Sequence, residues 1–322
     1  MYDSVVTGCA GFIGSHLTEQ LIQRGDRVLG IDSFDDYYSA EAKGSNLAAL
    51  EGQPRFTLVR GDLRTLPLAD YFGPETTVFH LAAQPGVRGS WGTNFHRYVE
   101  NNILATQVVL ETLASAPRRG RLAYASSSSV YGEPPDGPTP EDAPTRPISP
   151  YGMTKLAGEH LVRLYGRTRG LSTVALRFFT VYGPRQRPDM AFHKFFRAVE
   201  KGDPIEVYGD GRQMRDFTYV DDIVAGVLAA SESEVEGEVF NLGGGSPVGL
   251  ETAIRYVGEA AGSPVSIRHV EAQAGDPRST SADIGRAARV LHYAPRVTLK
   301  EGLVRQWAWQ GGSEGRRISL AA

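Results

Sequence analysis

The first half of the chain alternates short runs of β-branched and other apolar residues with longer segments whose apolar residues recur at helical spacing. Such alternation is typical of a parallel sheet whose strands are joined by crossover helices. Helical spacing predicts helices at 13–21, 99–113 and 156–164. The apolar runs predict strands at 3–7, 27–31, 56–59, 77–81, 121–125 and 173–178. We therefore predict an α/β fold built on a doubly wound parallel sheet.

The pattern changes beyond this half. The stretch 133–150 is rich in proline, which disrupts helices and central strands, and it predicts a surface loop. After Phe178 the alternation becomes irregular and rich in Gly, Pro and Arg, which indicates a second region for ligand contact. We predict a cofactor-binding domain at 1–177, to which the segment 214–241 returns, and a smaller C-terminal α/β substrate-binding domain made of 178–213 and 242–322.

Composition narrows the function classes. The 322 residues include 34 basic and 37 acidic side chains, so neither a nucleic-acid partner nor a membrane-surface partner is expected. No apolar run is long enough to cross a bilayer, the N-terminus does not read as a secretory signal, and the lone Cys9 suits a reducing cytoplasm. The 7 histidines lack metal-binding spacing, so no metal site is expected. These features favour a cytoplasmic protein with a small-molecule ligand.

A glycine-rich segment follows the first predicted strand and opens the first helix. Gly8 permits a tight turn, Gly11 lets the backbone approach a diphosphate, and Gly14 lets the helix pack close to the sheet. The free N–H groups of that helix favour the negative charge of the diphosphate. Asp32, ending the second strand, is suited to bind a ribose diol and repel a 2′-phosphate, and Asp62 is suited to meet the adenine. The segment predicts a Rossmann-type domain that binds NAD rather than NADP.

A second group of residues points to redox chemistry. Tyr151 and Lys155 are spaced at i and i+4 in a segment that reads as a helix start, so their side chains share one helix face. The ordinary pKa of tyrosine, about 10, is too high for a base at neutral pH, and a neighbouring ammonium with the positive nicotinamide would lower it. The serines at 126–129 leave the fifth strand where a parallel sheet presents its ligands. The pattern predicts a proton acceptor beside a hydride acceptor.

The order of motifs resembles that of one family. The motifs lie at 7–14, 80–83, 128–132, 149–155, 177–184 and 215–222. Together they look like those of the extended short-chain dehydrogenases, the NAD-dependent epimerases and dehydratases that act on nucleotide sugars. The resemblance covers essentially the whole chain. It implies an enzyme, and the presence of Ser127, Tyr151 and Lys155 argues against a non-catalytic dinucleotide-binding protein. A simple dehydrogenase that releases NADH is a further alternative, which a steady rise in NADH absorbance would favour.

The resemblance implies a role for each matching residue. Ser127 would bond the 4-hydroxyl of the sugar, Tyr151 would remove its proton as C4 gives a hydride to NAD, and Lys155 would hold the nicotinamide ribose and tune the tyrosine. The residues implied to contact the cofactor are Gly8, Gly11, Phe12, Ile13, Gly14, Asp32, Asp62, Leu63, Leu81, Ala82, Ala83, Tyr151 and Lys155.

Loss of the 4-hydroxyl proton and of the C4 hydride would leave a 4-keto sugar, and what happens to this intermediate decides which reaction the enzyme catalyses. Related 4,6-dehydratases carry an Asp-Glu pair directly after the catalytic Thr, and UDP-glucuronate decarboxylases carry a Glu at the position of Ser129. This chain has Ser128 and Ser129 there. Because no carboxylate is available at these positions for acid–base chemistry at C5 and C6, return of the hydride to the opposite face of C4 is the economical outcome. The resemblance therefore implies a 4-epimerase.

Two segments indicate the substrate. Those at 35–38 and 185–192 look most like UDP-glucuronate 4-epimerases, in which Arg185 with Ser128 and Ser129 would hold the C5 carboxylate through charge-assisted hydrogen bonds. The predicted function is interconversion of UDP-glucuronic and UDP-galacturonic acids. A 4-epimerase for UDP-glucose or UDP-N-acetylglucosamine is the alternative. Thr280 matches a position where a bulky side chain excludes N-acetyl sugars in some relatives, and because threonine is small it leaves UDP-N-acetylglucosamine possible.

The remaining predictions come from the resemblance alone. Thr180 stands where epimerases for neutral hexoses commonly have Asn, and it would bond a sugar hydroxyl. Relatives pair two subunits through helices that match 99–113 and 156–164, so a homodimer is expected. The residues implied to bind the nucleotide are Arg212, Arg215 and Arg278 at the diphosphate and Asp276 near its ribose.

Overall fold

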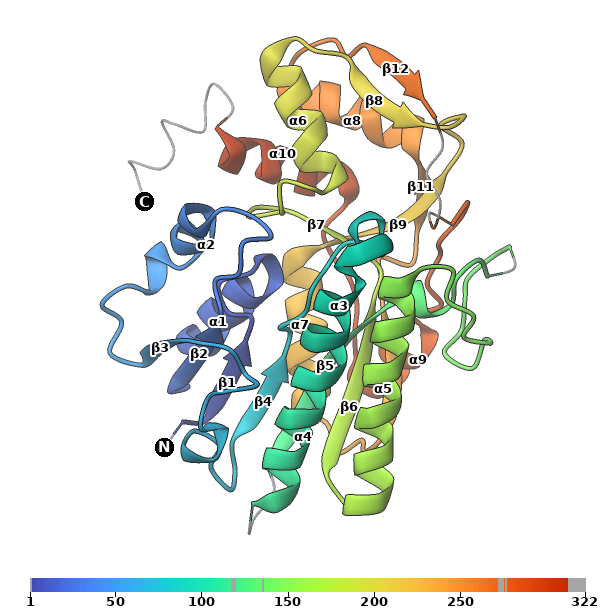
Figure 1. The fold of residues 1–322 in the computed structure, drawn as a ribbon. Coiled ribbons are helices and arrows are strands. Elements are labelled where there is room, and N and C mark those ends of the chain that lie inside the picture. Colours follow the sequence, from blue (N-terminus) through green and yellow to red (C-terminus); the bar gives the residue numbers. More distant parts are fainter. Residues whose placement is uncertain (1, 117–119, 135, 272–274, 276, 312–322) are drawn as a thin grey trace.

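The computed structural model describes residues 2–116, 120–134, 136–271, 275 and 277–311. Its centre is a seven-stranded sheet in the order β10-β6-β5-β4-β1-β2-β3, and the described pairings within it are parallel (Figure 1). The strands are β1 (Ser4–Thr7), β2 (Val28–Asp32), β3 (Phe56–Arg60), β4 (Thr77–His80), β5 (Arg121–Ser127), β6 (Ser172–Phe178) and β10 (Glu238–Leu242). All six predicted strands are present, and the doubly wound fold is confirmed.

Helices cover both faces of this sheet because its strands alternate their apolar side chains. On β1, Val6 packs with Leu17 of α1 (Phe12–Arg24) in one core, and Val5 packs with Val109 of α4 (Ala105–Ser115) in another. The first core also contains apolar residues of α7 (Val220–Glu232), and the second contains residues of α5 (Pro150–Arg169). In Figure 1, α4 and α5 lie in front of the sheet and α1 and α7 behind it.

The two predicted helices on the front face form with local differences. The one predicted at 99–113 is a continuous run of α3 (Phe95–Tyr98), a π-helical turn η5 (Val99–Leu104) and α4. Within the π turn, buried Asn102 donates to the Gln84 carbonyl and to the Thr154 hydroxyl. The helix α5 begins where the sequence predicted, because the Ser149 hydroxyl caps it by accepting from Gly152 N at 3.1 Å.

A smaller part lies above the carboxyl ends of the main strands (Figure 1). Its strands are β7 (Thr180–Tyr182), β9 (Met214–Tyr219) and β11 (Pro247–Gly249) in one sheet, and β8 (Ile205–Tyr208) with β12 (Ile267–Val270) in another. Its helices are α6 (Ala191–Lys201), α8 (Leu250–Ala261) and α10 (Leu299–Gln310), whereas α9 (Gly285–Leu291) packs near β10. The segment 214–241 was predicted to return to the cofactor-binding domain. Its strand β10 joins the main sheet and its helix α7 packs against that sheet, whereas its strand β9 belongs to the three-stranded sheet of the smaller part.

The order of the strands creates an opening at the carboxyl edge of the main sheet. Strand β1 lies between β2 and β4, and the loop after β1 leads toward β2 while the loop after β4 leads toward β5, so the two loops run in opposite directions. Open parallel sheets bind their ligands at such a switch point. The described part of the proline-rich stretch 133–150 is a loop until α5, as predicted, apart from an isolated bridge from Thr139 to Ala282. The short elements are α2 (Ala40–Asn46), η1 (Ala48–Leu50), η2 (Leu68–Asp70), η3 (Arg88–Ser90), η4 (Gly92–Asn94) and η6 (Ser128–Val130).

Candidate active site

The glycine loop between β1 and α1 is built so tightly that side chains are excluded. Gly8 has a φ of 73°, and a Cβ added there would lie 2.9 Å from backbone atoms of Ala82. A Cβ on Gly14 would lie 2.1 Å from the Gly8 carbonyl oxygen. Gly11 is the N-cap of α1, whose free N–H groups favour a bound anion. The loop therefore has the close backbone approach that a dinucleotide diphosphate requires.

Two carboxylates at the carboxyl edge are held by different partners. Asp32 is buried at the end of β2, where its oxygens accept hydrogen bonds from Ala10 N at 3.1 Å and Phe34 N at 2.8 Å. Burial raises the pKa of Asp32, and these bonds and the Lys43 charge act against that rise. Asp62 is clamped by the Arg64 guanidinium at 2.6 to 3.1 Å, which lowers the pKa of this carboxyl. Asp32 stands where a ribose diol is bound in this fold, so the site fits NAD.

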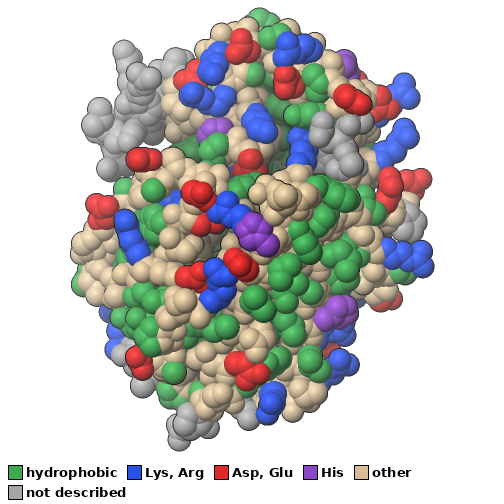
Figure 2. All heavy atoms as spheres, viewed as in Figure 1, with side chains coloured by type: hydrophobic (Ala, Val, Ile, Leu, Met, Phe, Trp, Pro, Cys, Tyr) green, Lys and Arg blue, Asp and Glu red, His purple; other side chains and the backbone are tan. Residues whose placement is uncertain are grey.

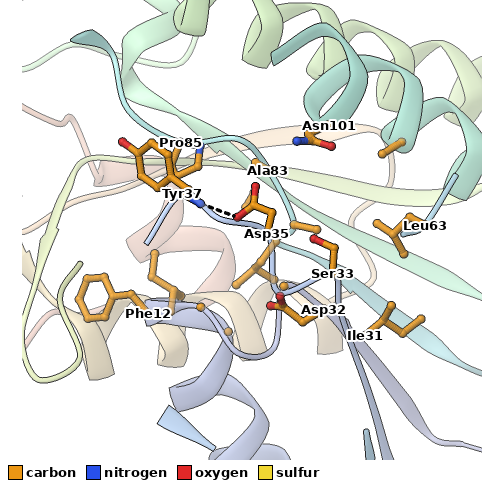
Figure 3. Close-up of a pocket in the computed structure, with 18 of the residues that line it drawn as sticks. Phe12, Ile31, Asp32, Ser33, Asp35, Tyr37, Leu63, Ala83, Pro85 and Asn101 are labelled. Carbon is orange, nitrogen blue, oxygen red and sulfur yellow. Dashed lines mark hydrogen bonds between the residues drawn. The ribbon is translucent and has the colours of Figure 1, made fainter. Parts of the chain in front are cut away.

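The cavity at this edge collects the predicted cofactor residues (Figure 3). Every residue predicted from the sequence to contact NAD lines it, including Leu63, Leu81, Ala82 and Ala83. The cavity has further lining residues that the sequence reasoning did not assign to the cofactor. Those from the loops, from α2 and from the π turn are Ser33, Asp35, Tyr37, Tyr38, Lys43, Pro85 and Asn101.

Tyr151 lies in the first turn of α5, on a wall shared by this cavity and a larger second one. Burial raises the pKa of Tyr151 above its ordinary value. A hydrogen bond with Ser127 and the positive charge of Arg187 act against this rise. Part of the charge that favours the phenolate thus comes from Arg187, a residue outside the set predicted from the sequence.

Lys155 follows one turn later on the same helix and is almost fully enclosed. Burial lowers its pKa to about 7, and the negative charge of Glu159 opposes this shift. Its Nζ lies 4.6 Å from the centre of the Tyr124 ring. Glu159 accepts from the Ser126 hydroxyl at 2.8 Å and forms a buried ion pair with Arg177, at 2.6 and 3.0 Å. The helix therefore carries a buried carboxylate one turn beyond Lys155 that favours its charged form.

The second cavity opens beside Tyr151 and extends under the smaller part of the molecule. Its volume of about 1270 Å³ exceeds the ~300–1,000 Å³ of most small-molecule sites, which suits an extended ligand. Ser127 Oγ accepts from Ser129 N at 3.1 Å and lies 3.2 Å from Ser129 Oγ, so the serines form one polar wall. The predicted substrate residues that line this cavity are Ser127, Ser128, Ser129, Thr180 and Arg215.

The structure places Arg185, predicted to hold a sugar carboxylate, against α1 rather than at the cavities. This residue adopts a left-handed backbone conformation with a φ of 64°, and its Nη2 bonds Glu19 of α1 at 2.6 Å. It is not among the residues that line either cavity. Arg187, two positions on, lines both of them, and its guanidinium is held by Asp189. Of these two arginines, only Arg187 lines the wall beside Tyr151.

The remaining predicted substrate residues are dispersed. Arg212 and Arg278 are exposed and do not line the second cavity, although the Arg278 carbonyl accepts from Arg215 Nη1 at 3.3 Å. Thr280 is half-buried, and its N–H donates to the Met214 carbonyl. Asp276 lies outside the described residues. Of the implied nucleotide contacts, the structure therefore brings only Arg215 to the cavity within the part of the chain it describes.

Among the described residues, no group of three or more His, Cys, Asp or Glu side chains is arranged to hold a metal ion. None of the helices within the described ranges has the length and apolar character needed to cross a membrane.

A parallel sheet with a glycine cradle, a buried carboxylate at the end of β2 and a buried Tyr-Lys pair defines an NAD-binding enzyme of the short-chain dehydrogenase type. More narrowly, the chain belongs to the NAD dependent epimerase/dehydratase family, whose model matches residues 4–243. The family and the cofactor predicted from the sequence are confirmed.

Individual relatives are similar over nearly the whole chain. An uncharacterized UDP-glucose epimerase of Bacillus subtilis (strain 168), YtcB, is 42% identical over 307 residues, covering 95% of this chain and 96% of that protein. UDP-glucuronate 4-epimerase 2 of Arabidopsis thaliana is 38% identical, over 99% of this chain and 78% of that protein. The crystal structure of UDP-glucuronic acid 4-epimerase from Bacillus cereus with UDP-glucuronic acid and NAD has a TM-score of 0.92 at 41% identity, covering 95% of this chain and 98% of that one. These similarities identify an NAD-dependent enzyme of the epimerase type.

Proposed function

We propose that the chain is a UDP-glucuronate 4-epimerase, which interconverts UDP-glucuronic acid and UDP-galacturonic acid. The observation that carries the proposal is the cavity wall beside Tyr151, which combines the hydroxyls of Ser128, Ser129 and Thr180 with the guanidinium of Arg187. Hydroxyl and guanidinium groups are the donors that a buried carboxylate needs. The similarity to the Bacillus cereus enzyme, crystallised with UDP-glucuronic acid and NAD, supports the same substrate.

The catalytic residues act on the 4-hydroxyl of the sugar. NAD would be held in the first cavity by the glycine loop and Asp32, and it would supply a reversible hydride acceptor for C4, so the reaction would have no net redox change. Ser127 bonds the 4-hydroxyl, and Tyr151 as phenolate takes its proton and later returns it to the 4-keto oxygen. Lys155 lies one helical turn from the tyrosine, and as an ammonium it would hold the nicotinamide ribose and stabilise the phenolate.

The carboxylate must be held for a chemical reason. A 4-keto uronate is a β-keto acid, which loses CO₂ when its carboxylate can align with the ketone. Arg187, Ser128 and Ser129 hold that group against the cavity wall. The two serine positions also lack the carboxylates that would eliminate water across C5 and C6. Return of the hydride to the opposite face of C4 is then the reaction left to the site.

The test is product analysis with the purified protein and UDP-glucuronate. Mass spectrometry should find a product of unchanged mass, and NMR should identify it as UDP-galacturonate. A product lighter by CO₂ would indicate a decarboxylase, and one lighter by water a dehydratase. Conversion of UDP-glucose without any conversion of UDP-glucuronate would contradict the substrate assignment.

The alternative is a 4-epimerase for UDP-glucose or UDP-N-acetylglucosamine. One observation favours it: Arg187 is already paired with Asp189, so the local charge of the wall is partly neutralised. The similarity to a protein named as a UDP-glucose epimerase points the same way. An Arg187→Ala variant distinguishes the two functions, because an enzyme for neutral sugars should keep most of its activity.

We also propose that the enzyme is a cytoplasmic homodimer. Buried, unpaired Cys9 suits a reducing compartment, and cell fractionation would check the cytoplasmic location.

The dimer is proposed to form through the face of η5 and α5. Leu104, Met153 and Leu164 are 48%, 53% and 44% exposed on these helices, and Figure 2 shows hydrophobic side chains gathered over this face. Light scattering should find a dimer, and a Leu104→Glu, Met153→Glu double variant should be a monomer. Val304→Glu, at an equally exposed position on α10, should leave the dimer intact.

A further inference from the structure

Two short segments that are far apart in the sequence meet between the two cavities. Tyr37, in the loop after β2, lines both cavities, and its hydroxyl donates a hydrogen bond to Asp189 Oδ2 at 3.2 Å. Asp189 also accepts from Arg187, through Nε to Oδ1 and Nη2 to Oδ2, each at 2.9 Å. The segments 35–38 and 185–192, which were singled out separately in the sequence, are therefore joined by one hydrogen-bonded contact.

This contact fixes the guanidinium of Arg187. A bidentate carboxylate sets the plane of a guanidinium group and here occupies its Nε edge. The N–H groups on Nη1 and the second hydrogen on Nη2 remain suited to another acceptor. Arg187 lines the wall next to Tyr151, and its charge opposes the rise that burial causes in the pKa of that tyrosine. The acceptor would then lie at the reacting end of the substrate.

Tyr37 is itself held in position. Its backbone N–H donates to Asp35 Oδ1 at 3.3 Å, the contact drawn in Figure 3. The same carboxylate oxygen accepts from Nζ of buried Lys43 at 2.8 Å. Across the cavity, Gly86 has a φ of 95°, and a Cβ there would lie 2.3 Å from the Tyr37 hydroxyl oxygen. The loop holds the phenol beside Asp189, and the missing side chain of Gly86 leaves room for its hydroxyl there.

We propose that Asp189, held by Tyr37, is a positioning residue that orients Arg187 and so sets selectivity for a uronate over a neutral sugar. The inference rests on the proposed function, because it concerns how the same site grips a C5 carboxylate. An arginine without Asp189 must lose its rotamer freedom when the substrate binds, whereas a clamped one has already lost it. A neutral sugar has no carboxylate for the guanidinium to bind, so the clamp affects its turnover only through the charge that Arg187 places near Tyr151, which influences the pKa of that tyrosine less than burial or the Ser127 hydrogen bond does.

The test compares steady-state kinetics of NAD-loaded Asp189→Ala, Asp189→Asn and Tyr37→Phe with UDP-glucuronate and with UDP-glucose. Asp189→Ala should reduce kcat/KM for UDP-glucuronate by about tenfold or more, chiefly by raising KM. Asp189→Asn keeps an acceptor oxygen and should restore most of that loss. Tyr37→Phe removes one neutral hydrogen bond and should cost about two- to tenfold. Relative activity on UDP-glucose should change by less than about threefold in each variant, which also shows that they fold.

The possible outcomes distinguish failure of the positioning role of Asp189 from failure of the proposed function. Asp70→Ala, at an exposed aspartate of η2 that lines neither cavity, is the matched control and should change nothing. Equal losses on both sugars, or a gain on UDP-glucuronate in Asp189→Ala, would overturn the positioning role. The gain would mean that Asp189 acts by repelling the substrate carboxylate. Failure of the unmodified enzyme to convert UDP-glucuronate would overturn the proposed function, and the positioning role with it.

Discussion

The cofactor half and the substrate half of the site fix their charged residues in different ways. In the cofactor half, Asp32 is held by backbone N–H groups around the glycine loop, and Asp62 is held by Arg64, two residues away. In the substrate half, Arg187 depends on Asp189, which is bonded by Tyr37 from a loop of the other half. Asp32 and Asp62 are thus held by groups of the glycine loop and the strand ends, whereas the pair of Arg187 and Asp189 depends also on Tyr37, 152 positions away in the chain.

The two halves meet at Tyr151, so its hydroxyl should have the largest effect. Tyr151→Phe removes the proton acceptor and should lower kcat by about 10²- to 10⁴-fold on any sugar the enzyme converts. Initial rates with UDP-glucuronate measure this loss. Tyr256→Phe on α8, whose hydroxyl lies outside both cavities, is the control and should keep full activity. A Tyr151→Phe variant with more than a tenth of the original rate would require another base.

Substitutions in the glycine loop test whether close backbone packing fixes the cofactor half of the site. Gly14→Ala forces a methyl group to within 2.1 Å of the Gly8 carbonyl, so it should cost about 1–3 kcal/mol of unfolding free energy and weaken NAD binding. Gly44→Ala in α2 meets no atom within 4 Å and should be neutral or stabilising by up to about 1 kcal/mol. Chemical denaturation and NAD titration measure both. Similar stabilities for the two variants would show that the loop relaxes.

Much of the cofactor half could be predicted from the sequence for this reason. The turn at Gly8, the carboxylate at the end of β2 and the shared helix face of Tyr151 and Lys155 follow from short-range geometry. The choice between Arg185 and Arg187 does not, because it depends on a left-handed turn at 185 and on Glu19 of α1. The contact between Tyr37 and Asp189 spans 152 positions, and no spacing rule in the chain signals it.

The core of the cofactor half should respond to acid. His80 is fully buried between the hydroxyls of Thr7 and Thr106, and burial lowers its pKa from 6.5 to about 3. The folded state keeps it neutral, whereas the unfolded chain binds a proton near pH 6.5. Its contribution to stability is therefore complete above pH 6.5 and is lost as the pH falls toward 3, by up to about 1.4 kcal/mol per pH unit.

A substitution at His80 separates its contribution to the pH dependence of stability from that of other groups. His80→Asn should flatten the pH dependence of the unfolding free energy between pH 6.5 and 4, measured by urea denaturation, even though it lowers stability at neutral pH. The control is His292→Asn at an exposed left-handed position, where Asn is well tolerated, and it should keep the original slope. An unchanged slope in His80→Asn would assign the acid sensitivity to other groups.

The assignment of the substrate arginine is tested most directly by kcat/KM for UDP-glucuronate in Arg187→Ala and Arg185→Ala. Truncating a charged partner of a buried carboxylate costs about 2–5 kcal/mol, so Arg187→Ala should lose about thirtyfold or more, and unpaired Asp189 would add repulsion. Arg185→Ala breaks only the ion pair with Glu19 and should stay within about threefold of the original value. A larger loss in Arg185→Ala than in Arg187→Ala would contradict the account.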